Sequence, residues 1–109
     1  MKVSMLDPVD IALLQRKGPE VAAILRLLAN EKRLMALCIL AQSGEMSAGA
    51  LGEAVGLGQS ALSQHLALLR AEGLVTARRE AQTLHYHISD PRVEALLAAL
   101  HAIYCPPET

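Results

Sequence analysis

The amino-acid sequence predicts a mainly α-helical fold with one small β-hairpin, in a single domain of 109 residues. Hydrophobic residues make up 52% of the chain, but Phe and Trp are absent and Tyr occurs twice. An aliphatic, Ala- and Leu-rich composition of this kind favours helices. Helical periodicity runs to about residue 72, and residues 74–88 then follow the two-residue alternation that is typical of strands.

The residues that begin and end helices divide the chain into six helical segments. Gly18 and Pro19 are expected to end the first helix and to begin the second. Asn30, Ser47 and Asp90 can each cap the N-terminus of a later helix. The expected helices cover residues 8–17, 19–29, 31–42, 47–55, 59–72 and 91–104.

The hairpin is predicted between the fifth and the sixth helix. The stretches "LVTARRE" (74–80) and "LHYHI" (84–88) are strand-like and flank residues 81–83. In the second stretch, apolar side chains alternate with His85 and His87, which predicts one buried face and one exposed face.

The terminal helices carry more apolar surface than one small core can bury. The helix over residues 91–104 is apolar on nearly every side, and the helices before residue 30 have the same excess. One larger core is an alternative, but we prefer a homodimer through the terminal helices. The single domain, residues 1–109, is therefore divided into dimerisation helices (1–29 and 91–105), a helix-turn-helix (47–72) and a wing (74–88).

The helix-turn-helix is predicted from the segment between Ser47 and Glu72, in which a Gly-rich turn joins two helices. In this arrangement the second helix enters the major groove of DNA. One face of that helix has a leucine stripe, and another carries short hydroxyl and amide side chains that can bond to base edges. An ordinary polar face is the alternative. The relevant polar residues are Ser60, Ser63 and Gln64.

The hairpin that follows directly makes the arrangement a winged helix-turn-helix. Arg78 and Arg79 lie near its tip together with Gln82 and Thr83, where they could reach phosphates. The net charge of −1 argues weakly against nucleic acid, but the charge is unevenly distributed. Residues 57–79 carry three Arg and one Glu, which sum to +2, so the predicted DNA-binding region is basic.

Composition also excludes several classes of protein. The sequence shows no secretory signal and no stretch near the roughly 20 apolar residues that span a bilayer, so a cytoplasmic location without membrane contact is expected. Two cysteines are too few for a disulfide scaffold, and the absence of C-x-x-C argues against a thioredoxin-type enzyme. No enzyme activity is expected.

Three stretches together carry a family resemblance: "LANEKRLMALCIL", "LSQHLALLRAEGLV" and "REAQTLHYHI". Through them the chain resembles the ArsR/SmtB family of bacterial repressors over about residues 20–105. The resemblance implies a dimeric repressor that leaves its double-stranded DNA operator when an inducer alters the dimer. A two-fold dimer is expected to bind an imperfect palindrome. The positions of the family that contact DNA fall on Gln59, Ser60, Ser63, Gln64 and His65, with the wing at 78–83. His65 lies beside the leucine stripe, so a packed or capping histidine is the alternative there.

Many relatives in this family sense metals, but the ligand sets are incomplete in this chain. Relatives bind metals at one of two places: a cysteine cluster in the first helix of the helix-turn-helix, or Asp, His and Glu ligands of the last helix. The first helix of the helix-turn-helix has no cysteine here, and the last helix offers only Asp90 and His101. A closed zinc site requires four ligands. His101 with Cys105 and Cys38 is the best remaining metal arrangement. We expect no tight metal site and no other cofactor.

The two cysteines occupy different settings. Cys38 follows a helical apolar stripe, where a thiol is commonly a small buried hydrophobe. Cys105 lies at a helix end that is followed by two prolines, where burial is not forced. The motifs "LCIL" and "IYC" resemble the cysteine positions of the persulfide-sensing dithiol branch of the family, the BigR/SqrR/HlyU type.

That resemblance implies a sensing pair, in which inorganic or organic persulfides join Cys38 and Cys105 within one subunit by sulfur atoms. Four alternatives stay open. The protein could be a zinc-responsive regulator, or a constitutive dimeric DNA-binding protein with structural cysteines. A thiol enzyme is the third, although it would need an activated thiolate with a nearby His or Arg and a substrate pocket, and His101 is the only such group that the sequence offers. The fourth is a dimeric interaction module that does not bind DNA, against which the Ser and Gln face and the arginine wing argue.

Overall fold

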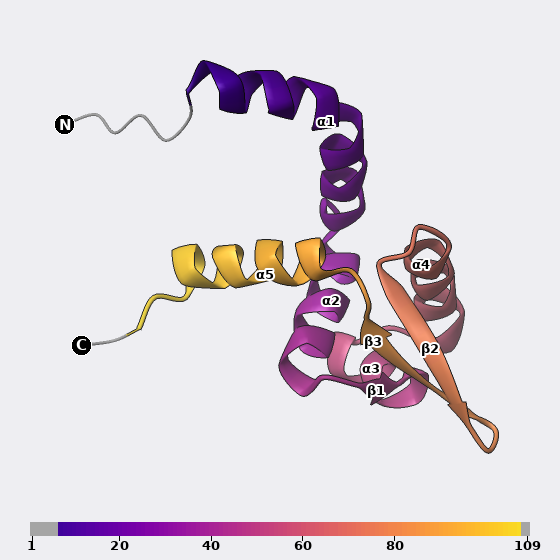
Figure 1. Cartoon of the computed structure of the whole chain (residues 1–109). Helices are drawn as coiled ribbons and strands as arrows, with labels where there is room; N and C mark the ends of the chain where they lie inside the picture. The colour runs from indigo at the N-terminus through magenta and orange to yellow at the C-terminus, as the bar shows by residue number, and fades with distance from the viewer. Residues whose placement is uncertain (1–6, 108–109) are drawn as a thin grey trace.

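A computed structural model describes residues 7–107 of the chain. Predictions for residues 1–6 and 108–109, which include both ends of the expected domain, lie outside the described residues. From the N- to the C-terminus the elements are α1 (Pro8–Leu28), α2 (Glu31–Ser43), β1 (Met46–Ser47), α3 (Ala48–Val55), α4 (Gln59–Ala71), β2 (Val75–Glu80), β3 (Thr83–Ile88) and α5 (Pro91–Tyr104). The mainly helical fold with a small hairpin is thus confirmed (Figure 1).

Helix α1 is a single helix where the sequence predicted two. Asp7 and Asp10 form a capping box at its start, and Pro19 lies inside it. A proline has no N–H to donate and its ring crowds the preceding turn, so it bends a helix that tertiary contacts hold together. Figure 1 shows α1 changing direction about halfway along its length. The predicted break at Gly18 and Pro19 was therefore wrong, and the structure has a bend there.

The predicted caps of the later helices are present. The side chain of Asn30 accepts a hydrogen bond from the Arg33 N–H at 3.0 Å, and Ser47 accepts one from Ala50 at 3.2 Å. Asp90 accepts a hydrogen bond from the backbone N–H of Arg92 at 2.9 Å. These side chains satisfy N–H groups that a helix leaves without partners in its first turn.

The sheet contains one strand more than the sequence predicted. The strand order is β1-β3-β2, and all pairings are antiparallel. The two-residue β1 pairs Met46 with Tyr86 and Ser47 with His85, directly before α3 begins. This strand is too short to have a detectable alternation, which explains why it was missed. It attaches the start of the helix-turn-helix to the hairpin.

The core lies where α2, α3 and α4 meet the sheet and the first half of α5. It is aliphatic apart from Tyr86, as the composition required. The largest fully buried side chains are Leu37, Leu40, Leu51, Leu66, Leu69, Leu74, Val75 and Val93. Burial of this kind stabilises a fold by about 25 cal/mol per Å² of apolar surface. The core thus fixes α3, α4 and the hairpin relative to one another.

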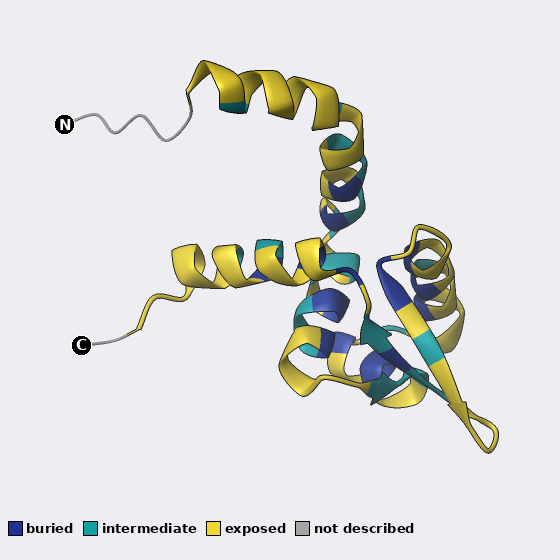
Figure 2. Cartoon of the chain, in the orientation of Figure 1, coloured by how far each residue is buried: buried dark blue, intermediate teal, exposed yellow. Residues whose placement is uncertain are grey.

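The first half of α1 and the end of α5 project away from this core. The radius of gyration is 16.2 Å, whereas a compact chain of this length has about 13 Å. Figure 2 shows both projecting segments as largely exposed. The exposed large apolar residues include Ile103 at 66% and Tyr104 at 77%, together with Val9, Ile11, Leu13 and Leu14. Within residues 7–107, no helix is both long enough and apolar enough to cross a membrane.

An ion-pair chain joins the two projecting helices near the core. Arg92 at the start of α5 pairs with Glu20 of α1 and with Asp90, whose carboxylate lies 2.7 Å from the guanidinium. The hydrogen bonds from the Arg92 side chain lower the pKa of the Asp90 carboxyl, partly opposed by its burial. Asp90 is the buried charged residue of the described core, and this pairing compensates its charge.

Candidate nucleic-acid interface and thiol pair

The crossing of α3 and α4 depends on two glycines. Gly56 ends α3 at φ +80°, a left-handed conformation that glycine adopts without strain. A Cβ at Gly52 would lie 3.1 Å from the carbonyl oxygen of Leu57 and 3.3 Å from the Leu62 side chain. A small residue is therefore needed for the two helices to approach each other this closely.

Helix α4 has the two faces that the sequence predicted. Leu62, Leu66 and Leu69 are at most 3% exposed and anchor the helix in the core. His65 is half-buried beside this stripe, which agrees with the packed position considered for it. The exposed residues among the predicted DNA contacts are Gln59, Ser60, Ser63 and Gln64. They form a continuous polar surface at the N-terminal half of the helix.

The two wing arginines lie on opposite faces of the sheet. Side chains alternate along a strand, so Arg79 shares a face with Ala77 and the buried Val75. That face packs on the core and on α4. Arg78 lies on the other face. Arg79, Gln82 and Thr83 are all exposed around the turn of the hairpin.

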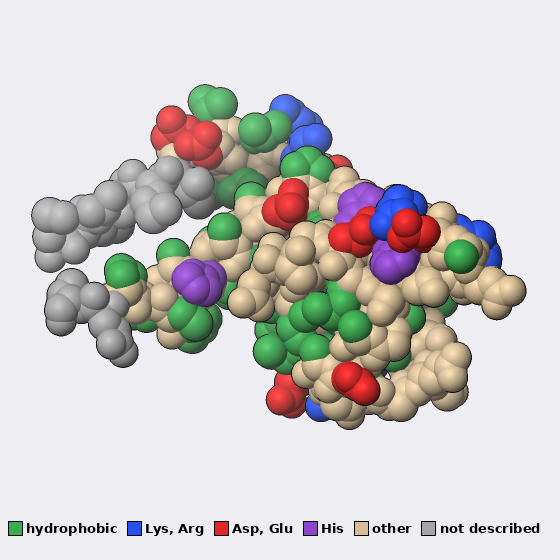
Figure 3. Space-filling model, turned by 90° about the horizontal axis from the view of Figure 1, so that it is seen from below, with side chains coloured by type: hydrophobic (Ala, Val, Ile, Leu, Met, Phe, Trp, Pro, Cys, Tyr) green, Lys and Arg blue, Asp and Glu red, His purple; other side chains and the backbone are tan. Residues whose placement is uncertain are grey.

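Arg78 is held by an acidic partner that the sequence did not reveal. Its guanidinium donates to both carboxylate oxygens of Glu45, at 2.8 and 3.2 Å. This interaction lowers the pKa of the Glu45 carboxyl and raises that of Arg78. Glu80 lies 3.6 Å from both Arg78 and His85. Figure 3 shows acidic, basic and histidine side chains clustered together on one part of the molecular surface.

The thiols lie on α2 and just after α5, two elements that pack on each other. Both are free, with Cys38 half-buried against the core and Cys105 exposed at the C-cap of α5. Burial raises the pKa of the Cys38 thiol, and the charge of Cys105 raises it further. The predicted pair therefore belongs to two elements that pack on each other.

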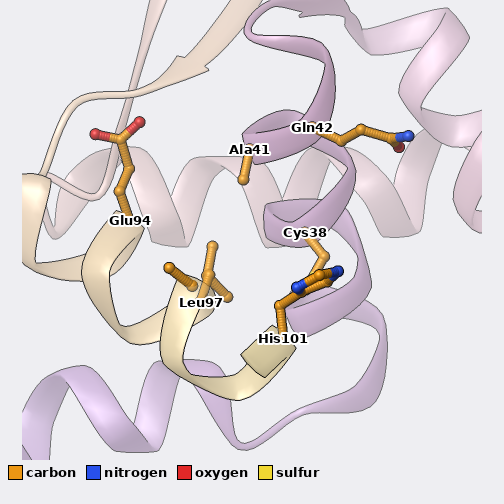
Figure 4. A pocket seen from close by; sticks show the side chains of 7 residues that line it. Cys38, Ala41, Gln42, Glu94, Leu97 and His101 are labelled. Atoms are coloured by element: carbon orange, nitrogen blue, oxygen red, sulfur yellow. The ribbon is translucent and has the colours of Figure 1, made fainter. Parts of the chain in front are cut away.

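A pocket of about 450 Å³ opens between α2 and α5 beside Cys38. Its walls are mainly apolar, and the polar side chains around it are those of Gln42, Glu94 and His101. Figure 4 shows His101 and Cys38 toward one end of the pocket, with Glu94 toward the other end. A small molecule in this pocket would reach the Cys38 sulfur.

Within residues 7–107, no group of three or more His, Cys, Asp or Glu side chains is arranged to hold a metal ion. The His101, Cys105 and Cys38 set is therefore not assembled as a three-ligand site in this conformation.

The predicted site residues thus form two separate groups. The polar face of α4 and the hairpin lie on one side of the core, and α5 with Cys105 extends to the other side (Figure 1). Sequence reasoning missed Glu45, because it reaches Arg78 only through the pairing of β1 with β3. It considered His101 as a metal ligand and as the one group that could serve a reactive thiolate, but helix spacing alone does not reveal the pocket that His101 shares with Cys38.

Comparisons with known proteins identify the family. Residues 30–77 match the family described as "Bacterial regulatory protein, arsR family". The transcriptional activator HlyU of Vibrio cholerae is 43% identical over 98 residues, which cover 90% of each chain. The crystal structure of the transcriptional repressor BigR from Xylella fastidiosa is similar with a TM-score of 0.80 and 36% identity, and covers 86% of this chain and 95% of BigR.

A homodimeric winged helix-turn-helix DNA-binding domain from Mycobacterium bovis, described as a possible ArsR-family regulator, is also similar. Its TM-score is 0.70 with 34% identity, over 93% of this chain and 89% of that one. These relatives are regulators of transcription, with both an activator and a repressor among them. The chain therefore belongs to the ArsR family of winged helix-turn-helix transcriptional regulators.

Proposed function

We propose that the protein is a homodimeric repressor whose operator binding is switched off when persulfides join Cys38 to Cys105. The observation that carries this proposal is the position of the two thiols on packed elements, with a pocket open beside Cys38. The protein would act in the cytoplasm, where thiols are normally kept reduced.

The dimer is proposed to form through α1 and α5. Their exposed apolar residues lie outside the core, and such surface is typical of an interface with another chain. The relative from Mycobacterium bovis is homodimeric, which supports a dimer for this chain as well. A two-fold dimer presents two α4 helices, which fits a palindromic operator with half-sites in successive major grooves.

The DNA contacts are proposed to come from α4 and the wing. Gln59, Ser60, Ser63 and Gln64 would bond to base edges, because short hydroxyls and amides can both donate and accept there. Arg79, Gln82 and Thr83 would contact the backbone from the hairpin. His65 is half-buried, so its contribution would be to position α4. Arg78 would contribute less than Arg79, because Glu45 already holds it.

The chemistry of the switch needs only persulfide as a reactant. Each thiolate attacks the outer sulfur of a hydropersulfide, RSSH, the sulfur–sulfur bond of the donor breaks, and RSH leaves. Both cysteines become persulfides, Cys–SSH. The terminal sulfur of one then attacks the inner sulfur of the other and H₂S leaves, so the shortest such route ends in a three-sulfur bridge.

The proposed bridge would act on DNA binding through α5. A link between α2 and the end of α5 would restrain a helix of the proposed dimer interface, and thereby the spacing of the two α4 helices. Each inserted sulfur adds about 2 Å of reach, whereas a direct disulfide requires Cα atoms within roughly 7 Å. Selectivity for persulfide over peroxide would then depend on the separation of the two helices.

The test compares operator binding by the wild-type protein, Cys38→Ser and Cys105→Ser with and without glutathione persulfide. All three reduced proteins are expected to bind operator DNA equally, and only the wild type is expected to release it after treatment. Release by both single variants would overturn the dithiol assignment. No release by the wild type would favour a constitutive regulator with structural cysteines.

A further inference from the structure

The face of α5 that borders the pocket is separate from the face that contacts α1. Glu94, Ala98 and His101 are spaced by four and three residues, so they lie on one side of the helix. Arg92, which contacts Glu20 of α1, precedes His101 by nine residues, or about two and a half turns. The two side chains therefore project in opposite directions. The pocket therefore borders the side of α5 that lies opposite Arg92.

The two thiols in this region differ in their exposure. Cys105 is exposed at the end of α5, whereas Cys38 is half-buried against apolar side chains. Burial and the charge of Cys105 both raise the pKa of Cys38, so its protonated form is favoured at neutral pH. The thiolate is the nucleophile in persulfide chemistry, and Cys38 therefore needs a group that removes its proton.

His101 is the base that shares a pocket with Cys38. Both side chains line that pocket and lie toward the same end of it, away from Glu94 (Figure 4). The other titratable group that lines the pocket is Glu94, at its far end. Cys105 is not a lining residue, but it follows α5 directly, and its backbone N–H bonds to the His101 carbonyl at 2.8 Å. Imidazole is the side chain best suited to exchange a proton near neutral pH.

We propose that His101 accepts the proton of the Cys38 thiol when Cys38 attacks a hydropersulfide bound in this pocket. The Cys38 sulfur bonds to the outer sulfur of RSSH, the donor's sulfur–sulfur bond breaks, and His101 returns the proton to the leaving RS⁻. The products are Cys38–SSH and RSH; the hydropersulfide is the oxidant and is reduced to the thiol, so no further oxidant or reductant is needed. This inference rests on the proposed persulfide function. It adds that His101 assists the first step, in which Cys38 takes sulfur from the hydropersulfide.

The first test measures the reactivity of Cys38 without any persulfide. In a Cys105→Ser background, the rate of alkylation by iodoacetamide is measured from pH 6 to about pH 10. His101→Gln is expected to slow the reaction about tenfold at pH 7, less than the roughly 100-fold of a fully positioned base, because His101 is exposed. The two rates should converge above the pKa of the thiol, where no base is needed. His85→Gln, on the hairpin, is the matched control and should leave the profile unchanged.

The second test measures sulfur transfer from glutathione persulfide to Cys38 by mass spectrometry in the same variants. His101→Gln is expected to slow it by a similar factor at pH 7, and added free imidazole is expected to restore part of the rate. Operator binding by the reduced His101→Gln protein should equal that of the wild type, which shows that the fold is intact. Equal rates and pH profiles with and without His101 would overturn the role of His101 as a base and would leave the proposed switch standing. Sulfur transfer to Cys38 that depends on His101 but is not followed by release of DNA would support the role of His101 and would refute the proposed switch.

Discussion

The two wing arginines should differ in their contribution to DNA binding, although they are adjacent in the sequence. Arg79 lies on the same face of the sheet as the core and α4, and it has no ion-pair partner among the described residues. Arg78 lies on the opposite face and is held by both oxygens of Glu45. A guanidinium already neutralised by a carboxylate releases few additional counterions when a phosphate approaches.

The size of the effect follows from the salt dependence of protein–DNA association. Each phosphate contact contributes about 0.9 to the slope of log K against log salt concentration. In a dimer with two wings, Arg79→Ala should reduce the slope by about 1.8. The drop in affinity between roughly 50 and 200 mM salt should therefore be about 12-fold smaller than in the wild type. Arg78→Ala should reduce the slope by less than about half of that amount. Glu45→Gln should increase the slope, because it frees Arg78 to meet the backbone.

Fluorescence anisotropy with a labelled operator, measured over a range of salt concentrations, gives the slope for each variant. Random-sequence DNA of the same length is the control, since backbone contacts should change both affinities equally. Equal slopes for Arg78→Ala and Arg79→Ala, together with no change in Glu45→Gln, would refute the assignment of Arg78 to a structural pair.

Three further predictions concern base recognition, the dimer and the thiols. Gln64→Ala should cost about 1–3 kcal/mol of preference for the operator over mismatched sequences, and unchanged preference in competition binding would contradict the assigned face of α4. Ile103→Glu should weaken the dimer and DNA binding together, as measured by light scattering and anisotropy. Ile103 is chosen because it is 66% exposed, whereas Leu100 also packs on the core, so its substitution would disturb the fold. A monomeric wild type or a dimeric Ile103→Glu protein would argue against the proposed interface. At pH 7, iodoacetamide should modify Cys105 faster than Cys38 because burial raises the pKa of Cys38, and the difference should narrow at higher pH. A faster reaction at Cys38 in peptide mapping would contradict this order.

The sequence predicted the elements that depend on local signals. The caps at Asn30, Ser47 and Asp90 and the leucine stripe of α4 were all found where the pattern placed them. Pro19 was misjudged because a proline disrupts helical hydrogen bonds locally, but whether the helix ends or bends depends on the packing around it.

The features that the sequence did not predict depend on contacts between distant residues. Glu45 meets Arg78 across 33 positions, because β1 pairs with β3, the central strand, and β3 pairs with β2, which carries Arg78. The pocket that His101 shares with Cys38 likewise depends on how α5 packs on α2. Neither arrangement has a local pattern, since both follow from the tertiary structure.

The most direct test of the proposed switch is the intact mass of the protein after treatment with glutathione persulfide, measured alongside operator binding. The account predicts that the wild type gains whole sulfur atoms and loses two hydrogens, with no bound glutathione, and that operator release follows the same time course. Cys38→Ser and Cys105→Ser should carry at most an open persulfide and should keep the operator. Release of DNA by the wild type without this mass change, or the same release in both variants, would contradict the account.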